Sequence, residues 1–230
     1  MNVALIVAAG KGTRMGPGRD KLFLDLNGRP VIAHTWKRFD DADCIDAIVL
    51  VVRQGIEADF ARIGKEFGFR KPVHFAAGGA ERQDSVWNGL EALPAGAEIV
   101  AIQDGARPCT PTAVIRESIN VAREMGAAVA AQRISDTVKE SIDGKVISRH
   151  LERKLLWAVQ TPQTFQVSVI RKALAAVRAK GLSVTDDTAA CEAIGQPVQL
   201  IESAEPNPKV TLPSDIPYIC QLLDRESTHD

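Results

Sequence analysis

The stretch Val3–Phe23, VALIVAAGKGTRMGPGRDKLF, decides the fold, because a short run of apolar residues breaks abruptly into glycines. Val3–Val7 has the length and composition of one buried strand, and the residues after it are typical of a tight loop. Glycine leaves backbone N–H groups open to an anion, so a loop in this position usually holds phosphate. Lys11, Arg14 and Lys21 add three cations within reach of the loop. The stretch therefore predicts a site for a polyphosphate compound.

The composition is that of an ordinary enzyme-sized chain. Its 230 residues, 45% hydrophobic and 25% charged, fall within the size range of one α/β domain. The formal net charge of -1 gives no support to nucleic-acid or polybasic membrane binding. Four scattered cysteines favour free thiols, and four scattered histidines suggest no transition-metal cluster. The apolar start is too short for a membrane span and poor as a signal peptide, so we expect a cytoplasmic protein.

Beyond the first loop, β-rich runs alternate with helical patterns. Because these runs are apolar on both faces, the rhythm predicts a mostly parallel sheet covered by helices, an α/β fold. Ligands of such sheets bind beyond the carboxyl ends of the strands. The expected strands are 3–7, 47–52, 73–75 and 99–102, and the expected helices are 31–39, 56–67, 85–93 and 114–125.

The rhythm breaks after Ala131. The segment SDTVKESIDGKVISRHLER alternates small apolar with polar residues around Asp143-Gly144, the strongest hairpin signal in the chain. A two-stranded ribbon is marginal alone in water, so it should pack on its own domain or on a second subunit. We favour a projecting arm, approximately residues 134–155, that serves in dimerisation. Further helices are expected at 167–178, 188–194 and from Pro213, and further strands at 198–201 and Lys209–Thr211.

The glycine loop does not match the common phosphate-binding fingerprints. Gly10, Gly12 and Gly16 give G-x-G-x-x-x-G, one residue longer than the dinucleotide pattern. That pattern also expects an acidic residue ~20 positions further on; here the second strand ends near Arg53, well past that distance. No Walker loop occurs. A tight turn with solvated basic residues is the alternative interpretation, and a second motif weighs against it.

That second motif is AIQDGARPC, in which an apolar strand ends at Asp104. A carboxylate on the same edge of the sheet as the glycine loop is placed to bind Mg²⁺ or a ribose hydroxyl, although a turn-forming role would explain it equally. A third segment, AAGGAERQDSV, puts Gly78-Gly79 after a strand and Ser85 at a helix start. It suits contact with a nucleobase, or simply a helix entry capped by Asp84 or Ser85.

Several segments together resemble one family. AAGKGTRMG, GGAERQDSV, DGARP, SDTVKE, ERKLLWAVQTPQTF, VTDD and NPKVTLPSDI are similar, in order from Val3 to about Leu223, to 2-C-methyl-D-erythritol 4-phosphate cytidylyltransferases. The resemblance implies a Rossmann-like sheet, a homodimer held by an exchanged β-arm, and CTP with Mg²⁺ as donor. It implies transfer of CMP to methylerythritol phosphate, which gives 4-diphosphocytidyl-2-C-methyl-D-erythritol and pyrophosphate in non-mevalonate isoprenoid precursor biosynthesis.

The resemblance also implies roles for individual residues. In the family, an Arg and a Lys near the glycine loop stabilise the transition state, which here match Arg14 and Lys21. An Arg and a Lys that position the acceptor match Arg153 and Lys209. Asp104 is the candidate metal ligand. The remaining substrate-binding matches are Ala8, Ala9, Gly10, Gly12, Gly79, Ser85, Asp104, Gly105, Arg107, Thr137 and Thr161.

The chain departs from the family pattern at four positions. Asp20 stands where Pro is common, Gln103 where His is common, Ala80 where an acidic residue is frequent, and Pro208 where a larger apolar residue is usual. None of these removes a charge assigned to chemistry. They bear on base recognition and on the approach of Lys209.

Three alternatives to transfer onto methylerythritol phosphate remain open from the sequence. Besides methylerythritol phosphate, the acceptor of a cytidylyltransferase can be another polyol phosphate such as ribitol 5-phosphate. LERKLLW resembles the methylerythritol branch more closely. An NADP-binding oxidoreductase would need the missing fingerprint spacing, and a non-catalytic nucleotide-binding regulator would have little use for both Arg14 and Lys21. A phosphate nucleophile is largely dianionic at neutral pH, so the lack of a paired His and carboxylate is no obstacle to transfer.

Overall fold

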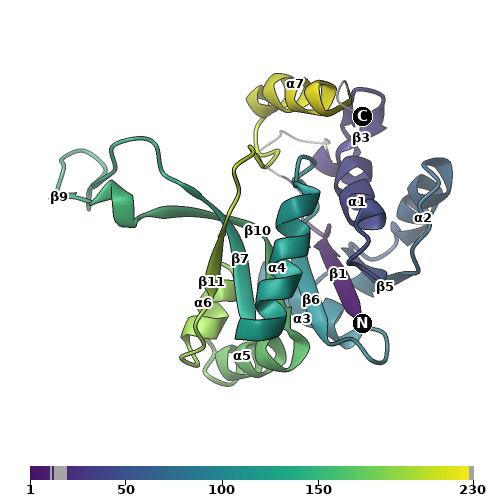
Figure 1. Ribbon diagram of the computed structural model, residues 1–230, viewed down its shortest axis with the longest axis horizontal. Coiled ribbons are helices and arrows are strands. Elements are labelled where there is room, and N and C mark those ends of the chain that lie inside the picture. Colours follow the sequence, from purple (N-terminus) through teal and green to yellow (C-terminus); the bar gives the residue numbers. More distant parts are fainter. Residues whose placement is uncertain (11, 13–19, 228–230) are drawn as a thin grey trace.

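A seven-stranded sheet forms the centre of the computed structural model, which describes residues 1–10, 12 and 20–227 (Figure 1). Its strand order is β11-β7-β10-β6-β1-β4-β5. β10 runs antiparallel to both of its neighbours, and the other adjacent pairs are parallel. The strands are β1 (Asn2–Val7), β4 (Ala47–Val52), β5 (Val73–Ala77), β6 (Ile99–Asp104), β7 (Ala127–Arg133), β10 (Trp157–Gln166) and β11 (Gln199–Glu202).

Helices cover both faces of the sheet. One face packs against α1 (Val31–Asp41), α2 (Glu57–Glu66), α4 (Thr112–Met125) and α7 (Ile216–Ser227), and the other packs against α3 (Arg82–Glu91), α5 (Val167–Ala179) and α6 (Asp187–Glu192). Successive strand residues point to opposite faces, so Ile6 joins the first core and Leu5 the second. The expected mostly parallel α/β fold is confirmed. None of the helices in the described residues is both long and apolar enough to cross a membrane.

Two strands of the central sheet were not expected from the sequence. β7 is rich in alanine, which is depleted in strands, and β10 contains Pro162 and a run of polar residues. The polar side chains of β10 are buried nonetheless; Thr164, for example, donates a hydrogen bond to Ser118 on α4. The register between β10 and β7 shifts between Val159 and Gln163, where the proline lies.

The expected strand at Lys209–Thr211 is wrong. This segment is extended but joins no sheet, because its backbone pairs with a turn: the Val210 N–H donates to the Ala106 carbonyl at 2.9 Å. It therefore crosses over the turn that follows β6. Pro213 opens a short 3₁₀ turn, η4 (Pro213–Asp215), and α7 follows directly.

Between β7 and β10 the chain extends away from the rest of the molecule (Figure 1). On this segment β8 (Lys139–Glu140) pairs antiparallel with β9 (Arg149–His150), a shorter ribbon than the sequence alternation predicts. Asp143 shapes the turn by accepting hydrogen bonds from the Lys145 and Val146 N–H groups. Since the structure describes one chain, the role of this segment in dimerisation stays a prediction.

Candidate active site

The carboxyl ends of the central strands bring the three sequence motifs together. Val7 is the register partner of Asp104, and the Gly105 N–H donates to the Val7 carbonyl at 2.9 Å. On the other side, the Gly78 N–H donates to the Val52 carbonyl at 2.8 Å. β1 lies between β4 and β6, so this edge is where the strand order changes direction. Such a switch point is the usual ligand site of a doubly wound sheet.

The glycine loop leads from β1 to Lys21. Arg14, an expected catalytic residue, lies outside the described residues. Gly12 has φ +60, and a Cβ built there would lie 3.1 Å from Cγ of Lys21, so the loop and the lysine stem are in close contact. Lys21 opens a short 3₁₀ turn, η2 (Lys21–Phe23), and its Nζ donates to the Val210 carbonyl at 3.0 Å. Ala8 is buried, Ala9 is partly exposed and Gly10 is exposed.

Asp20, which stands where the family often has Pro, ties the loop to the sheet. Its side chain caps η2 by accepting from the Leu22 N–H at 3.1 Å, and it forms an ion pair with Arg53 at the end of β4. Arg53 also donates to the Gly10 carbonyl at 3.2 Å. One guanidinium therefore holds both flanks of the glycine loop. Sequence reasoning missed this pair, because Arg53 was noted only as the end of a strand.

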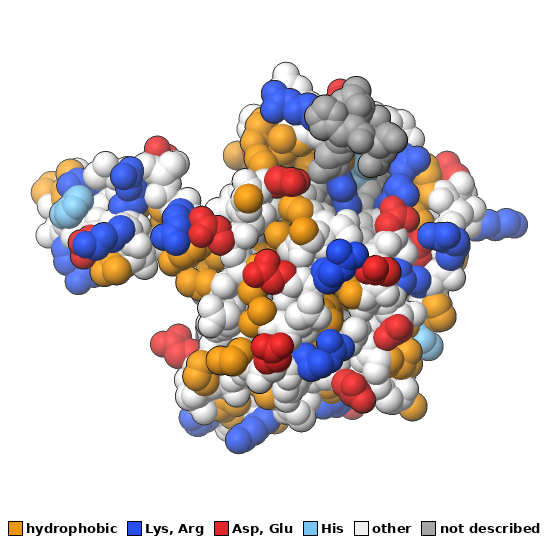
Figure 2. All heavy atoms as spheres, viewed as in Figure 1, with side chains coloured by type: hydrophobic (Ala, Val, Ile, Leu, Met, Phe, Trp, Pro, Cys, Tyr) orange, Lys and Arg blue, Asp and Glu red, His pale blue; other side chains and the backbone are white. Residues whose placement is uncertain are grey.

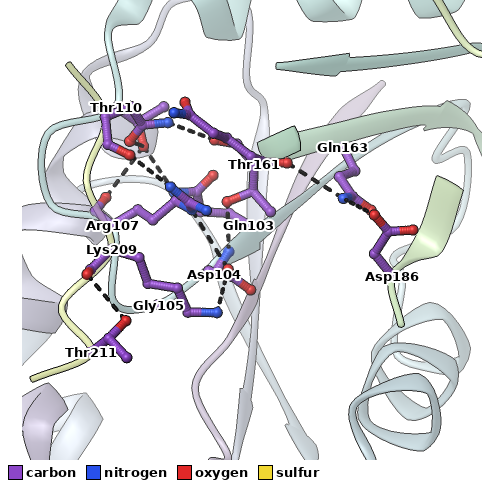
Figure 3. A network of polar contacts seen from close by, with 12 residues as sticks. Gln103, Asp104, Gly105, Arg107, Thr110, Thr161, Gln163, Asp186, Lys209 and Thr211 are labelled. Carbon is purple, nitrogen blue, oxygen red and sulfur yellow. Dashed lines mark hydrogen bonds and ion pairs between the residues drawn. The ribbon is translucent and has the colours of Figure 1, made fainter. Parts of the chain in front are cut away.

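Asp104 is the centre of a cation cluster (Figure 3). Its carboxylate is 2.8 Å from Lys209 Nζ, 3.6 Å from Arg107 Nε and 3.6 Å from Arg82 Nε. Burial opposes ionisation of this side chain, which is 13% exposed, but Lys209 and then Arg82 outweigh it and lower the pKa of Asp104 to about 2. Asp104 is thus a firmly ionised carboxylate surrounded by positive charge.

Asn207 holds the Lys209 segment in place and was missed by the sequence analysis. Its Nδ2 donates to the Thr161 carbonyl at 2.8 Å, and its own carbonyl accepts from Arg107 Nη1 at 2.6 Å. Thr161 Oγ1 in turn accepts from the Asp104 N–H at 3.2 Å. The segment NPKVT was recognised as a motif, but only the fold shows that its Asn anchors it.

The four positions that depart from the family pattern lie around these contacts. Gln103 is buried beneath the site, where Nε2 donates to Thr110 at 2.9 Å. Ala80 is exposed in the turn before α3, and Pro208 is partly buried between Asn207 and Lys209. Pro208 therefore does not prevent Lys209 from reaching Asp104.

The turn before α3 combines the two interpretations of its sequence. Ser85 Oγ accepts from the Gly79 N–H at 3.0 Å and donates to the Glu81 carbonyl at 3.2 Å, while Glu81 and Asp84 form a capping box. A Cβ built on Gly79 would lie 2.2 Å from Cβ of Asp84, so this position cannot carry a side chain without movement of the backbone. Glycine therefore leaves position 79 of this turn without a side chain.

Thr137 and Arg153 are not brought to this cluster within one chain. Both are exposed and lie on the extended segment between β7 and β10, with Arg153 opening η3 (Arg153–Leu155). Arg153 Nη1 donates to the Ser135 carbonyl of the same segment. The remaining expected residues, Gly105, Arg107, Thr161 and Lys209, do lie with Asp104.

The cluster does not fit a resident metal ion. Within the described ranges, no group of three or more His, Cys, Asp or Glu side chains is placed to hold one. Each oxygen of Asp104 already faces a cation within 3.6 Å. A divalent ion on the protein alone would meet strong like-charge repulsion. The expected metal role of Asp104 stays a prediction.

A doubly wound sheet with a glycine loop and a cation cluster at its switch point defines a class, the nucleotide-binding α/β enzymes. A model of one family within that class, IspD, 2-C-methyl-D-erythritol 4-phosphate cytidylyltransferase, matches residues 2–224. The chain belongs to this family.

Individual relatives agree with this assignment. The chain is 44% identical over 221 residues to the 2-C-methyl-D-erythritol 4-phosphate cytidylyltransferase of Alkaliphilus oremlandii, covering 95% of this chain and 93% of the relative. It is 42% identical to that of Geobacillus thermodenitrificans, covering 96% of each. Among solved structures, 4-diphosphocytidyl-2C-methyl-D-erythritol synthase from Anaerococcus prevotii superposes with a TM-score of 0.86 at 28% identity, covering 97% of this chain and 96% of that one.

The depressed pKa of Asp104 makes stability depend on pH. Because its folded pKa of about 2 lies below the ordinary value of 3.8, the ionised carboxylate stabilises the fold by roughly 2 kcal/mol, in full above about pH 5 and progressively less as the pH falls towards 2. We expect the difference in unfolding free energy between wild type and Asp104→Asn, measured with denaturant, to shrink as pH falls from 6 to 3. Asp59→Asn, in an exposed pair with Arg62, is the control and should change little. A difference that is constant with pH would contradict this.

Proposed function

We propose that this chain transfers CMP from CTP to 2-C-methyl-D-erythritol 4-phosphate, releasing pyrophosphate and forming 4-diphosphocytidyl-2-C-methyl-D-erythritol. One observation carries the proposal. Lys209, Arg107 and Arg82 surround Asp104, and Lys21 reaches the same segment through Val210. This is a site built for crowded negative charge, which is the condition created when a nucleoside triphosphate meets a sugar phosphate.

The transfer needs little acid or base from the protein. An oxygen of the acceptor phosphate attacks the α-phosphorus of CTP; a new phosphorus–oxygen bond forms, and the bond to the departing pyrophosphate breaks. The second pKa of a phosphate monoester is near ~6, so at neutral pH the nucleophile is already ionised and no proton has to be removed. The barrier is charge repulsion and the charge that grows on the transferred group. Preorganised cations and backbone N–H groups lower it.

The residues divide between donor and acceptor. Lys21, with Arg14, is proposed to stabilise charge on the α-phosphoryl group and the leaving pyrophosphate. The backbone of Ala8, Ala9, Gly10 and Gly12 is proposed to contact the triphosphate. The Gly79–Ser85 turn is proposed for the cytosine, and Asp104-Gly105 for the ribose. On the acceptor side, Lys209 is proposed to exchange the carboxylate of Asp104 for the acceptor phosphate, beside Arg107 and Thr161.

Mg²⁺ is an expectation that comes with the family. When bound, it would neutralise charge on the triphosphate. Its ligands would then come chiefly from the nucleotide, because Asp104 is already engaged by three cations.

The acceptor and the setting are also part of the proposal. Methylerythritol phosphate is favoured over ribitol 5-phosphate by the named relatives, and no described contact favours the second polyol. We propose that residues 1–230 form one nucleotidyltransferase domain, into which the arm, approximately residues 134–155, is inserted. Cysteines outside any disulfide, Cys44, Cys191 and Cys220, support a cytoplasmic location.

Loss of the Lys21 ammonium should remove transition-state stabilisation without unfolding the chain. We expect Lys21→Ala to lower kcat by at least on the order of 10²–10³, and Arg14→Ala to do the same, measured by pyrophosphate release from CTP and methylerythritol phosphate. Lys37→Ala, which breaks an exposed pair with Asp41, is the matched control and should keep full activity. Near-normal turnover of Lys21→Ala would refute its catalytic role.

The extended segment supports a dimer in which each chain completes the site of the other. It exposes apolar side chains that have no cover in one chain: Ile142 is 89% exposed and Val146 67%. Figure 2 shows this segment standing apart from the main body. We propose that a second copy covers these side chains and that Arg153 of the partner subunit reaches the acceptor phosphate. This arrangement explains why Arg153 and Thr137 lie away from Asp104 within the chain.

Subunit complementation tests this arrangement. Lys21→Ala damages the body of a site and Arg153→Ala damages the arm, so a mixed dimer keeps one intact site. At low acceptor concentration we expect each variant alone to be weak, and co-expressed variants to recover about a quarter of wild-type activity by random pairing. Activity no higher than the mean of the two single variants would place Arg153 in its own chain's site, or in none.

A further inference from the structure

Arg82, one of the cations around Asp104, also forms an ion pair with Asp187, and no role was given to that pair above. Arg82 is the first residue of α3, and Asp187 is the first residue of α6. Arg82 Nη1 lies 2.8 Å from Asp187 Oδ2, and Arg82 Nε lies 3.6 Å from Asp104 Oδ1. One guanidinium thus lies between a carboxylate of the site and a second carboxylate behind it.

The side chain of Asp187 is buried, which is an unfavourable environment for a charge. Its side chain is 1% exposed, and the nearest cation is the Arg82 guanidinium, with Nη1 at 2.8 Å from Oδ2. Burial raises the pKa of Asp187, and Arg82 acts in the opposite direction. A buried ion pair of this kind adds little stability compared with apolar residues of the same volume, so its presence suggests a role in positioning.

The surroundings of the pair join three parts of the fold. The Asp187 N–H donates to Gln163 Oε1 on β10 at 2.9 Å. Gln83, next to Arg82, accepts from the Val184 N–H at 3.1 Å, in the segment that leads into α6. The neighbouring residue Asp186 caps α6 by accepting from Ala189, which accounts for only one of the two adjacent carboxylates in VTDD. The other carboxylate, that of Asp187, pairs with Arg82.

We propose that Asp187 is a positioning residue for the nucleotide, acting through Arg82. Arg82 lies about one helical turn before Ser85, so the ion pair fixes the N-terminal turn of α3 that carries the Gly79–Ser85 contact. The same guanidinium holds Asp104 ionised at the end of β6. The pair thereby sets the spacing between the cytosine turn and the Asp104 edge. This inference rests on the proposed function, since it assigns the cytosine to that turn.

The test separates nucleotide binding from acceptor binding. Asp187→Asn and Arg82→Gln each remove one charge and keep much of the shape. We expect both to raise the KM for CTP, and the Kd for CTP with Mg²⁺ measured by calorimetry, on the order of 10- to 100-fold, with a much smaller change in acceptor KM. Arg82→Lys, which keeps the charge but loses the planar fork, should be intermediate. The double variant should be no worse than the more damaged single variant, because the two residues act as one unit.

A matched control is the ion pair at the other end of α3. Arg171 on α5 pairs with Glu91 at the other end of α3, so Arg171→Gln breaks an α3 ion pair far from the proposed cytosine turn. It should leave the KM and Kd for CTP unchanged, whatever it does to stability. Thermal unfolding of every variant shows whether it is folded. If Asp187→Asn does not fold, the partly exposed Arg82→Lys decides the question.

The outcomes are distinct. Unchanged CTP affinity in folded Asp187→Asn or Arg82→Lys overturns the inference, as does an equal loss in Arg171→Gln. A wild-type chain that binds CTP but releases no pyrophosphate with any polyol phosphate refutes the proposed transfer, and the Kd comparison then still decides the role of the pair. A wild-type chain that does not bind CTP overturns both.

Discussion

The ionised carboxylate of Asp104, buried at the end of β6, needs compensating positive charge, and the rest of the site is arranged around that need. A carboxylate in this position is costly unless it is paired. Lys209 arrives from the segment after β11, Arg107 from the turn after β6 and Arg82 from the start of α3. Parts of the chain that are remote in sequence therefore meet at one point because of one charge.

This arrangement also prepares the cations for a different anion. A lysine or arginine held against a carboxylate is already stripped of part of its water and fixed in orientation, so an arriving phosphate meets a preorganised group. The cost is competition, because in the proposed reaction the acceptor phosphate displaces Asp104 from Lys209. Asn207 and Arg107 limit how far the Lys209 segment can move during this exchange, through the bonds to Thr161 and to the Asn207 carbonyl. These bonds would let the proposed exchange of anions proceed with little motion of the backbone.

Local patterns in the sequence predicted much of this, and long-range pairings account for what they missed. The strand before Gly10, the helix of residues 31–39 and the strand ending at Asp104 follow from hydrophobic period and glycine placement, which are local properties. β10 was hidden because its buried face is polar and includes Pro162, features that suggest a loop until partners such as Ser118 are known. Lys209–Thr211 had the composition of a strand, but the neighbour that it pairs with is a turn.

Some charged residues of the site could be identified from the sequence, and others could not. Lys21 and Lys209 were named from a resemblance, whereas Arg82 and Asp187 stood in quoted segments without a role, because each is explained only by the other. No spacing rule links positions so far apart in a sequence. Two features of the sequence could have suggested Arg82 and Asp187. VTDD holds two aspartates where a helix cap uses one, and GGAERQDSV places an arginine at a helix start.

The central claim is that cations, and not a proton-accepting residue, drive the transfer. The pH dependence of kcat/KM for the acceptor tests it most directly, because this parameter reports ionisations of the free enzyme and free substrate. With methylerythritol phosphate we expect an acidic limb near pH ~6, the second pKa of the acceptor phosphate. With the corresponding phosphonate, whose second pKa is higher, that limb should move to higher pH by the same difference. A limb that stays at one pH with both acceptors would reveal a titrating base on the protein and contradict the account.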